Sequence, residues 1–210
     1  MIDKLLSDTK LKQSFDKCIL KLIGNKISAN QLTIAGLILG FLSAVSIFLS
    51  SIFINYFFIF LVLGITFMVL SFFIDLFDGI IARFDNPTIF GGILDMTCDR
   101  TVEVSIIIAI ILTDPSNLVI PGIFVLGSIV LCITVFLSVG HALNEEEIEN
   151  QKFIFYSTGL MERSETFLIL LITIILINFR FILLTLFSIL TSITTIQRIG
   201  FAYKKFHKKK

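Results

Sequence analysis

Four aspartates stand within one short stretch of a chain that is otherwise strongly apolar: Asp75, Asp78, Asp95 and Asp99. A carboxylate near membrane depth costs roughly 2.5–3.5 kcal/mol on insertion scales, so four of them persist only where cations or water offset that cost. The pattern therefore predicts a pair of divalent metal ions at these residues, holding a phosphate-bearing substrate.

The spacing of the aspartates suits helices. Asp75 and Asp78 are related as i and i+3, and Asp95 and Asp99 as i and i+4, so each pair projects from one face of its own helix. A short connection would let two such helices run antiparallel and present the pairs to each other. Hard oxygen ligands of this kind suit Mg²⁺, Mn²⁺ or Ca²⁺ rather than zinc, and two bridged ions could clamp a pyrophosphate.

Three residues between the pairs fit a binding groove. Gly79 removes a side chain where a substrate must approach the helix backbone, and Ala82 keeps the groove shallow one turn later. Arg83 offers a guanidinium fork for phosphate oxygens. Taken singly, small residues in a spanning helix indicate close packing, and an arginine at its end indicates anchoring. Their occurrence beside four aligned aspartates favours the groove.

The composition is that of a polytopic membrane protein. Of the 210 residues, 56% are hydrophobic and 16% are charged, and the mean hydropathy is +0.97. The length suits a single domain over residues 1–210. The three cysteines are odd in number and lack metal-ligand spacing, which argues against a disulfide framework or a zinc site. Nothing in the composition indicates a nucleic-acid partner.

The apolar segments predict an all-α protein with six transmembrane helices. Each segment is near the roughly 20 residues that a helix needs to cross the hydrocarbon core, and the segments are 31–50, 56–83, 93–112, 118–140, 164–178 and 181–202. Residues 1–23 alternate apolar and lysine positions at helical spacing, which predicts an amphipathic helix on the membrane surface; a soluble helix packed on a partner is the alternative. Residues 203–210 form a basic tail.

Basic residues indicate how the protein is oriented. If both termini are cytoplasmic, nearly all basic residues near helix ends fall inside: the N-terminal lysines, Arg83, Lys152, Arg163 and the stretch from Arg198 to Lys210. Only Arg180 falls outside. We therefore expect an integral protein of the cell (inner) membrane with both termini cytoplasmic. The aspartates then lie at the cytoplasmic end of the second and third spans.

One motif resembles a known family. The segment Asp75-x2-Asp78-Gly79-x2-Ala82-Arg83-x7-Gly91-x3-Asp95-x3-Asp99 is similar to the signature of the CDP-alcohol phosphatidyltransferase family and fills all eight of its fixed positions. The stretch Asn30-Gln31-Leu32-Thr33 resembles the family's Pro-Asn-x-x-Thr entry to the first span, although Ala29 replaces the usual proline. The resemblance extends to the architecture of nearly the whole chain.

The resemblance implies transfer of a phosphatidyl-type group from a CDP-linked lipid to the hydroxyl of a small alcohol, with release of CMP. Two divalent cations, Mg²⁺ or Mn²⁺, would be held by Asp75, Asp78, Asp95 and Asp99, and Asp99 would also act as general base. The expected contacts to the CDP-lipid are Gly79, Ala82, Arg83, Thr88, Gly91, Asn30 and Thr33. The family also implies a homodimer embedded in membrane lipids.

The acceptor alcohol is less clearly indicated. Arg163, at the start of the fifth span, could meet a phosphorylated acceptor such as glycerol 3-phosphate or an inositol phosphate, and unphosphorylated inositol is a further candidate. A capping role for Ser164 and Glu165, with Arg163 as an anchor, is the alternative. Glu103 lies one turn beyond Asp99 and could line the acceptor pocket or serve as a structural group, whereas Arg100 should face a neighbouring helix or the interface.

Two alternatives stay open at this point. Buried acids also mark cation-coupled transporters and metal carriers, although the chain lacks interrupted helices in matching halves and gathers its acids at one membrane face.

The spacing Gly36-x3-Gly40 either supports the homodimer or packs two spans of one subunit.

Overall fold

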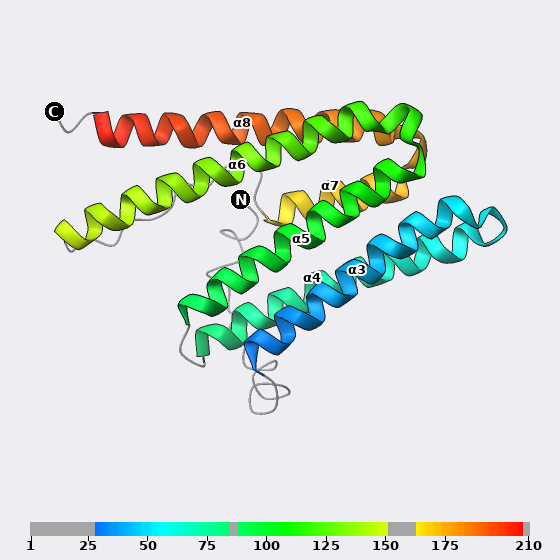
Figure 1. The fold of residues 1–210 in the computed structure, drawn as a ribbon, viewed down its shortest axis with the longest axis horizontal. Coiled ribbons are helices and arrows are strands. Elements are labelled where there is room, and N and C mark those ends of the chain that lie inside the picture. The colour runs from blue at the N-terminus through cyan, green and yellow to red at the C-terminus, as the bar shows by residue number, and fades with distance from the viewer. Residues whose placement is uncertain (1–27, 85–87, 151–162, 208–210) are drawn as a thin grey trace, which may run out of the picture. The chain divides into compact units, whose positions relative to one another are not determined.

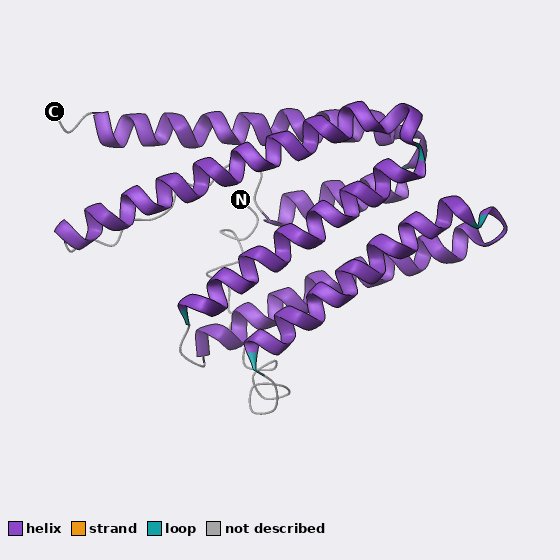
Figure 2. Ribbon diagram, in the orientation of Figure 1, coloured by secondary structure: helices purple, strands orange, loops and turns teal. Residues whose placement is uncertain are grey.

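The computed structural model describes residues 28–84, 88–150 and 163–207, and all of their secondary structure is helical (Figure 2). The α-helices and short 3₁₀ helices follow in the order α3 (Ala29–Ile52), η1 (Ile54–Tyr56), α4 (Phe57–Phe84), α5 (Ile89–Thr113), α6 (Pro115–Asn150), α7 (Arg163–Ile175), η2 (Ile177–Phe179) and α8 (Arg180–His207) (Figure 1). The all-α prediction is confirmed over these residues.

Four segments are long and apolar enough to cross a membrane: Ala29–Ile52, Ile54–Ala82, Pro115–Ala142 and Ile177–His207. Each of the six α-helices overlaps one predicted span, but α5 and α7 fall outside this criterion. Helix α5 carries Asp95, Asp99, Arg100 and Glu103, which interrupt its apolar sequence, and α7 is only 13 residues long. An integral membrane protein is therefore confirmed, and the crossing of the membrane by α5 and α7 stays a prediction.

Some sequence-based boundaries fall elsewhere. Helix α8 continues to His207, so the first part of the expected basic tail at 203–210 is helical. Helix α6 continues to Asn150, beyond residue 140, where the fourth predicted span ends. The amphipathic helix predicted at residues 1–23 lies outside the described residues.

The chain divides into two compact units. The first comprises residues 2–119 and contains α3, α4 and α5, and the second comprises most of α6 with α7 and α8. All four aspartates of the motif lie in the first unit.

Helix α3 is the central packing element of the first unit, because it lies along both α4 and α5. It begins with a capping box, in which the Ser28 hydroxyl accepts from the Gln31 amide and the Gln31 side chain accepts from the Ser28 amide. Helices α3 and α4 form an antiparallel hairpin closed by η1 (Figure 1). Two buried hydroxyls join them: Ser43 donates to the Gly64 carbonyl and Ser71 donates to the Gly36 carbonyl, both at 2.8 Å.

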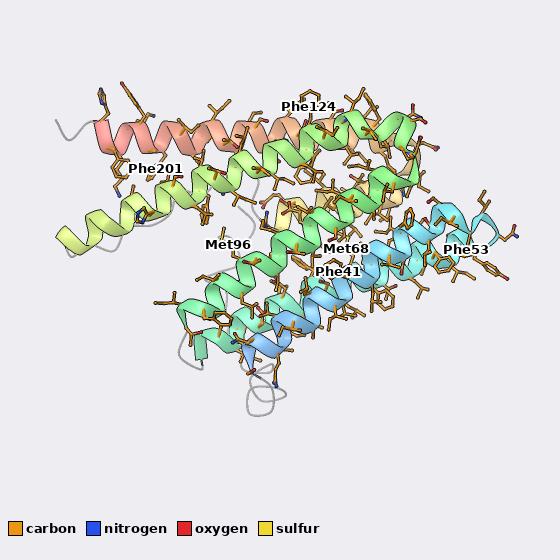
Figure 3. The ribbon with its side chains drawn as sticks, in the orientation of Figure 1. Phe41, Phe53, Met68, Met96, Phe124 and Phe201 are labelled. Carbon is orange, nitrogen blue, oxygen red and sulfur yellow. The ribbon has the colours of Figure 1, made fainter. Side chains whose placement is uncertain are left out.

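Apolar side chains surround these helices, as Figure 3 shows. Met68 of α4 is buried at 3% exposure, whereas Phe41 of α3 is 44% exposed. Phe53, at the α3–α4 turn, packs its ring against Phe60. Exposed aromatic and aliphatic side chains on a spanning helix suit contact with lipid tails.

The glycine pair of α3 packs helices of one subunit together. A Cβ at Gly36 would lie 3.5 Å from Ile74 of α4, and a Cβ at Gly40 would lie 2.3 Å from Val102 of α5. The alternative of packing within a subunit therefore accounts for this spacing. The homodimer stays a prediction that depends on the family resemblance.

Two arginines tie the helices of the second unit together. Arg180, the exception to the orientation rule, is 4% exposed and donates to the Thr173 and Ile174 carbonyls near the end of α7. A charge at this position therefore has a structural use, because it satisfies carbonyl groups at a helix C-terminus. Arg198 of α8 donates to the Cys132 carbonyl of α6.

The contact between Gly40 and Val102 yields a stability prediction. Gly40→Ala should lower the free energy of unfolding by about 1–3 kcal/mol, because the added Cβ overlaps the Val102 side chain and forces α3 and α5 apart. The thermal unfolding midpoint of the purified protein in detergent measures this change. Gly36→Ala is the matched control, since its Cβ meets only ordinary contacts; equal loss in both variants would contradict the prediction.

Candidate functional site

The motif residues meet at one end of the first unit. The last turns of α4 carry Asp75 and Asp78, and the first turns of α5 carry Asp95 and Asp99. Helix α3 begins where α4 ends, so its first residues reach the same end (Figure 1). Three helices thus supply one site, as the antiparallel arrangement predicted from the spacing requires.

Three of the four carboxylates converge. Oxygen atoms of Asp75, Asp95 and Asp99 all lie within 4.8 Å of one another, and the three residues are half-buried. Oxygen ligands of a Mg²⁺ or Ca²⁺ ion lie about 2.0–2.6 Å from it, so two ligands on opposite sides of an ion are about 4–5 Å apart. The cluster therefore fits a hard divalent cation in both ligand type and spacing.

Asp78 is placed differently. It is 3% exposed, and its Oδ2 accepts a hydrogen bond from Thr33 Oγ1 of α3 at 2.8 Å. Residues related as i and i+3 are separated by about 60° around a helix, which turns Asp78 away from Asp75 and toward α3. The structure thus brings Asp78 to the site but does not include it in the group of three close carboxylates.

A cavity of about 410 Å³ opens beside the carboxylates. Its lining includes most of the predicted lipid-nucleotide contacts together with two of the aspartates: Ser28, Ala29, Asn30, Thr33, Asp78, Gly79, Ala82, Thr88, Gly91, Gly92 and Asp95. A Cβ built on Gly79 meets nothing within 4 Å, so the space beside this glycine is open. This is the arrangement expected where a substrate approaches the helix backbone.

The first turn of α5 is held close to α3. Thr88 is the N-cap of α5, and its hydroxyl accepts from the Gly91 amide at 3.0 Å. A Cβ at Gly91 would lie 2.9 Å from Thr88 Oγ1 and 3.2 Å from Asn30 Oδ1. Gly91 therefore permits a close approach between α5 and α3, and Thr88 caps a helix as well as lining the cavity.

Three predicted site residues remain: Arg83, Arg163 and Glu103. The side chains of Arg83, in the last turn of α4, and Arg163, the first residue of α7, lie outside the described part of the structure. Glu103 is 6% exposed and forms an ion pair with Arg100 on its own helix. This pair favours the structural alternative for Glu103, and it gives Arg100 a partner on its own helix.

Sequence reasoning missed two residues of the cavity wall. Ser28 caps α3, and its position before a predicted span with a glutamine three residues later is the usual signature of a capping box. Gly92 follows the motif glycine directly, and a Cβ there meets nothing within 4 Å. Neither residue belongs to the eight-position motif.

Comparison with known proteins identifies the family. Residues 26–197 match the CDP-alcohol phosphatidyltransferase family. The chain belongs to this family. It is therefore a membrane phosphatidyltransferase of phospholipid biosynthesis, and the family activity is transfer from a CDP-linked lipid to an alcohol. The aspartate cluster agrees with the divalent cations that the family uses. No curated protein sequence matches the chain.

Solved structures support the same fold. The crystal structure of Mycobacterium tuberculosis phosphatidylinositol phosphate synthase with CDP-DAG bound is similar at a TM-score of 0.67 and 18% sequence identity, covering 93% of this chain and 94% of that one. The apo form of that synthase gives a TM-score of 0.65 at 18% identity, with coverage of 91% and 95%. At this level of identity the likeness shows the fold.

The tight contact at Gly91 yields a prediction about activity. Gly91→Ala should lower CMP release by roughly ten-fold or more, because the added Cβ displaces the Thr88 cap or Asn30 and shifts the cavity wall. Gly127→Ala on α6, whose Cβ meets nothing within 4 Å and which does not line the cavity, is the control and should leave activity close to wild type. Equal activities for the two variants, measured with the same CDP-lipid, would show that the close approach is unimportant.

Proposed function

We propose that this phosphatidyltransferase transfers the phosphatidyl-type group of CDP-diacylglycerol, or of an ether analogue, to the hydroxyl of a small polar alcohol with release of CMP. The main support is that Asp75, Asp95 and Asp99 converge beside a cavity. Asp78, Gly79 and Asp95 are among the residues that line this cavity. We propose two divalent cations, Mg²⁺ or Mn²⁺, at the four aspartates.

The cavity suits the CDP part of the donor. Its volume of about 410 Å³ is within the roughly 300–1,000 Å³ typical of small-molecule sites. Helices α3 and α5 both begin at its wall, and the positive ends of helix dipoles favour phosphate groups. The open side of Gly79 gives a diphosphate access to the backbone of α4. Ala82, Thr88, Gly91, Asn30 and Thr33 are the further proposed contacts, with Arg83 as a proposed partner of phosphate oxygens.

The proposed chemistry is displacement at phosphorus. Asp99 takes the proton of the acceptor hydroxyl, the acceptor oxygen forms a bond to the phosphorus of the lipid phosphate, and the bond from that phosphorus to CMP breaks. The cations, when bound, supply charge neutralisation at the reacting phosphate.

We propose glycerol 3-phosphate or an inositol, free or phosphorylated, as the acceptor. The solved structure of similar fold is a phosphatidylinositol phosphate synthase, and an inositol phosphate is therefore one of the candidates. Arg163 is the proposed contact for an acceptor phosphate. Glu103 is a weaker candidate, because its carboxylate is already paired with Arg100.

We also propose that the site faces the cytoplasm and that the protein is a homodimer. The distribution of basic residues supports the orientation. CMP is water-soluble, so a site facing the cytoplasm would release this product there. Both proposals are independent of the chemistry at the aspartates.

An acceptor panel separates the enzyme from the alternative of a cation carrier. Membranes containing the protein should release CMP from labelled CDP-lipid only when Mg²⁺ or Mn²⁺ and the right acceptor are present, and EDTA should abolish this release until metal is restored. Glycerol 3-phosphate, inositol phosphate, inositol and serine form the panel. Metal uptake into vesicles without acceptor-dependent CMP release would instead support the carrier.

Asp99→Asn tests the proposed base. We expect turnover to fall by roughly 100- to 10,000-fold, while binding of CDP-lipid is partly retained, because the amide can still occupy the site but cannot accept a proton. Turnover and CDP-lipid affinity are measured separately. Asp114→Asn, at the exposed opposite end of α5, is the matched control. Equal loss of binding and turnover in Asp99→Asn would make Asp99 a plain metal ligand.

A further inference from the structure

The hydrogen bond between Thr33 and Asp78 joins two buried side chains from different helices. Thr33 is 7% exposed and Asp78 is 3% exposed, and 2.8 Å separates Thr33 Oγ1 from Asp78 Oδ2. The Thr33 hydroxyl also lies 3.1 Å from the Ala29 carbonyl of its own helix. A hydroxyl has one proton to donate, and the shorter contact to a carboxylate is the stronger one.

A purely structural reading explains only part of this contact. Threonines in helices often donate to the carbonyl four residues earlier, as Thr66 does with the Val62 carbonyl. Thr33 differs, because it also reaches a carboxylate on α4. A buried carboxylate costs several kcal/mol, whereas one hydrogen bond from a neutral group returns only about 0.5–1.5 kcal/mol. The Gly79 amide also donates to this carboxylate. Two such bonds offset only part of the cost of burial, so a bound cation would stabilise Asp78 further.

We propose that Thr33 is a positioning residue, which orients the Asp78 carboxylate so that it contributes to cation binding at the aspartate cluster. This inference rests on the proposed function. Thr33 engages Oδ2, so the other carboxylate oxygen of Asp78 can serve as the ligand. Hydrogen bonds to the ligands of a metal hold them in the binding geometry, and losing one costs about 10–100-fold in metal affinity or activity. This role differs from the direct CDP-lipid contact that the motif position implies.

The position of Thr33 makes the role specific. Asp78 is turned about 60° around α4 from Asp75, and α3 is the helix on that side. Thr33 also lines the cavity together with Asp78. The same hydroxyl thus links the α3 wall of the cavity to the carboxylate pair of α4.

Binding of Mn²⁺ to the purified full-length protein, without substrate, tests the proposal. The probe is the electron paramagnetic resonance signal of free Mn²⁺ during titration. Thr33→Val should raise the Kd about 10–100-fold, and Thr33→Ser, which keeps the hydroxyl, should bind like wild type. In the activity assay, Thr33→Val should raise the Mn²⁺ concentration for half-maximal rate, and Thr33→Ser should not.

Ser43→Ala is the structural control. It removes another buried hydroxyl bond between α3 and α4, at a point of the hairpin away from the aspartates, and should leave the Kd unchanged. An unchanged Kd in Thr33→Val, or an equal rise in Ser43→Ala, would overturn the proposal. If Thr33→Val does not fold, Thr33→Ala replaces it in the titration. If neither variant folds while Thr33→Ser does, the hydroxyl is needed for folding, and this result would also overturn the proposal.

The failure of this inference is distinguishable from that of the proposed function. Wild-type protein that binds no Mn²⁺ would contradict the cation site itself. If the wild-type protein binds Mn²⁺ and releases CMP, and Thr33→Val binds Mn²⁺ with equal affinity, only the role of Thr33 is contradicted.

Discussion

The rest of the structure depends on one constraint, the mutual repulsion among the half-buried carboxylates of the aspartate cluster. Two unit charges at 4.8 Å, the limit of the spacing among Asp75, Asp95 and Asp99, repel by about 3–4 kcal/mol at an effective dielectric constant of 20. Three such pairs act together, and half-burial adds to the cost. A protein of modest net stability can keep this cluster only if the scaffold resists separation and if cations or protons neutralise it.

The scaffold resists separation through α3. This helix lies along both α4 and α5, and its contacts are made close by Gly40 against Val102 and by the hydroxyl bonds of Ser43 and Ser71. Because α3 ties the two aspartate helices together, the carboxylate ends of α4 and α5 can face each other across open space. The cavity beside Gly79 is a consequence of that arrangement.

Much of this could be predicted from the sequence, and the parts that could not have physical reasons. The predicted apolar stretches each overlap one of the six α-helices in the described residues. Four helical segments there are long and apolar enough to cross a membrane. The i, i+3 and i, i+4 spacings predict paired carboxylates. Helix ends were less predictable: α8 runs on through Tyr203 and Lys204, since a basic sequence does not by itself end a helix. Spacing also leaves open which side chain a residue meets, as the Arg100–Glu103 pair shows.

The two aspartate pairs differ in how far apart their members lie around the helix. An i, i+4 pair is separated by about 40° around a helix and an i, i+3 pair by about 60°. Asp95 and Asp99 can therefore both join one cluster, whereas Asp75 and Asp78 diverge, and only Asp75 meets the other two. Asp78 then depends on α3 for its orientation, through Thr33. If Thr33 has the proposed positioning role, α3 contributes to the cation site although it carries none of the four carboxylates.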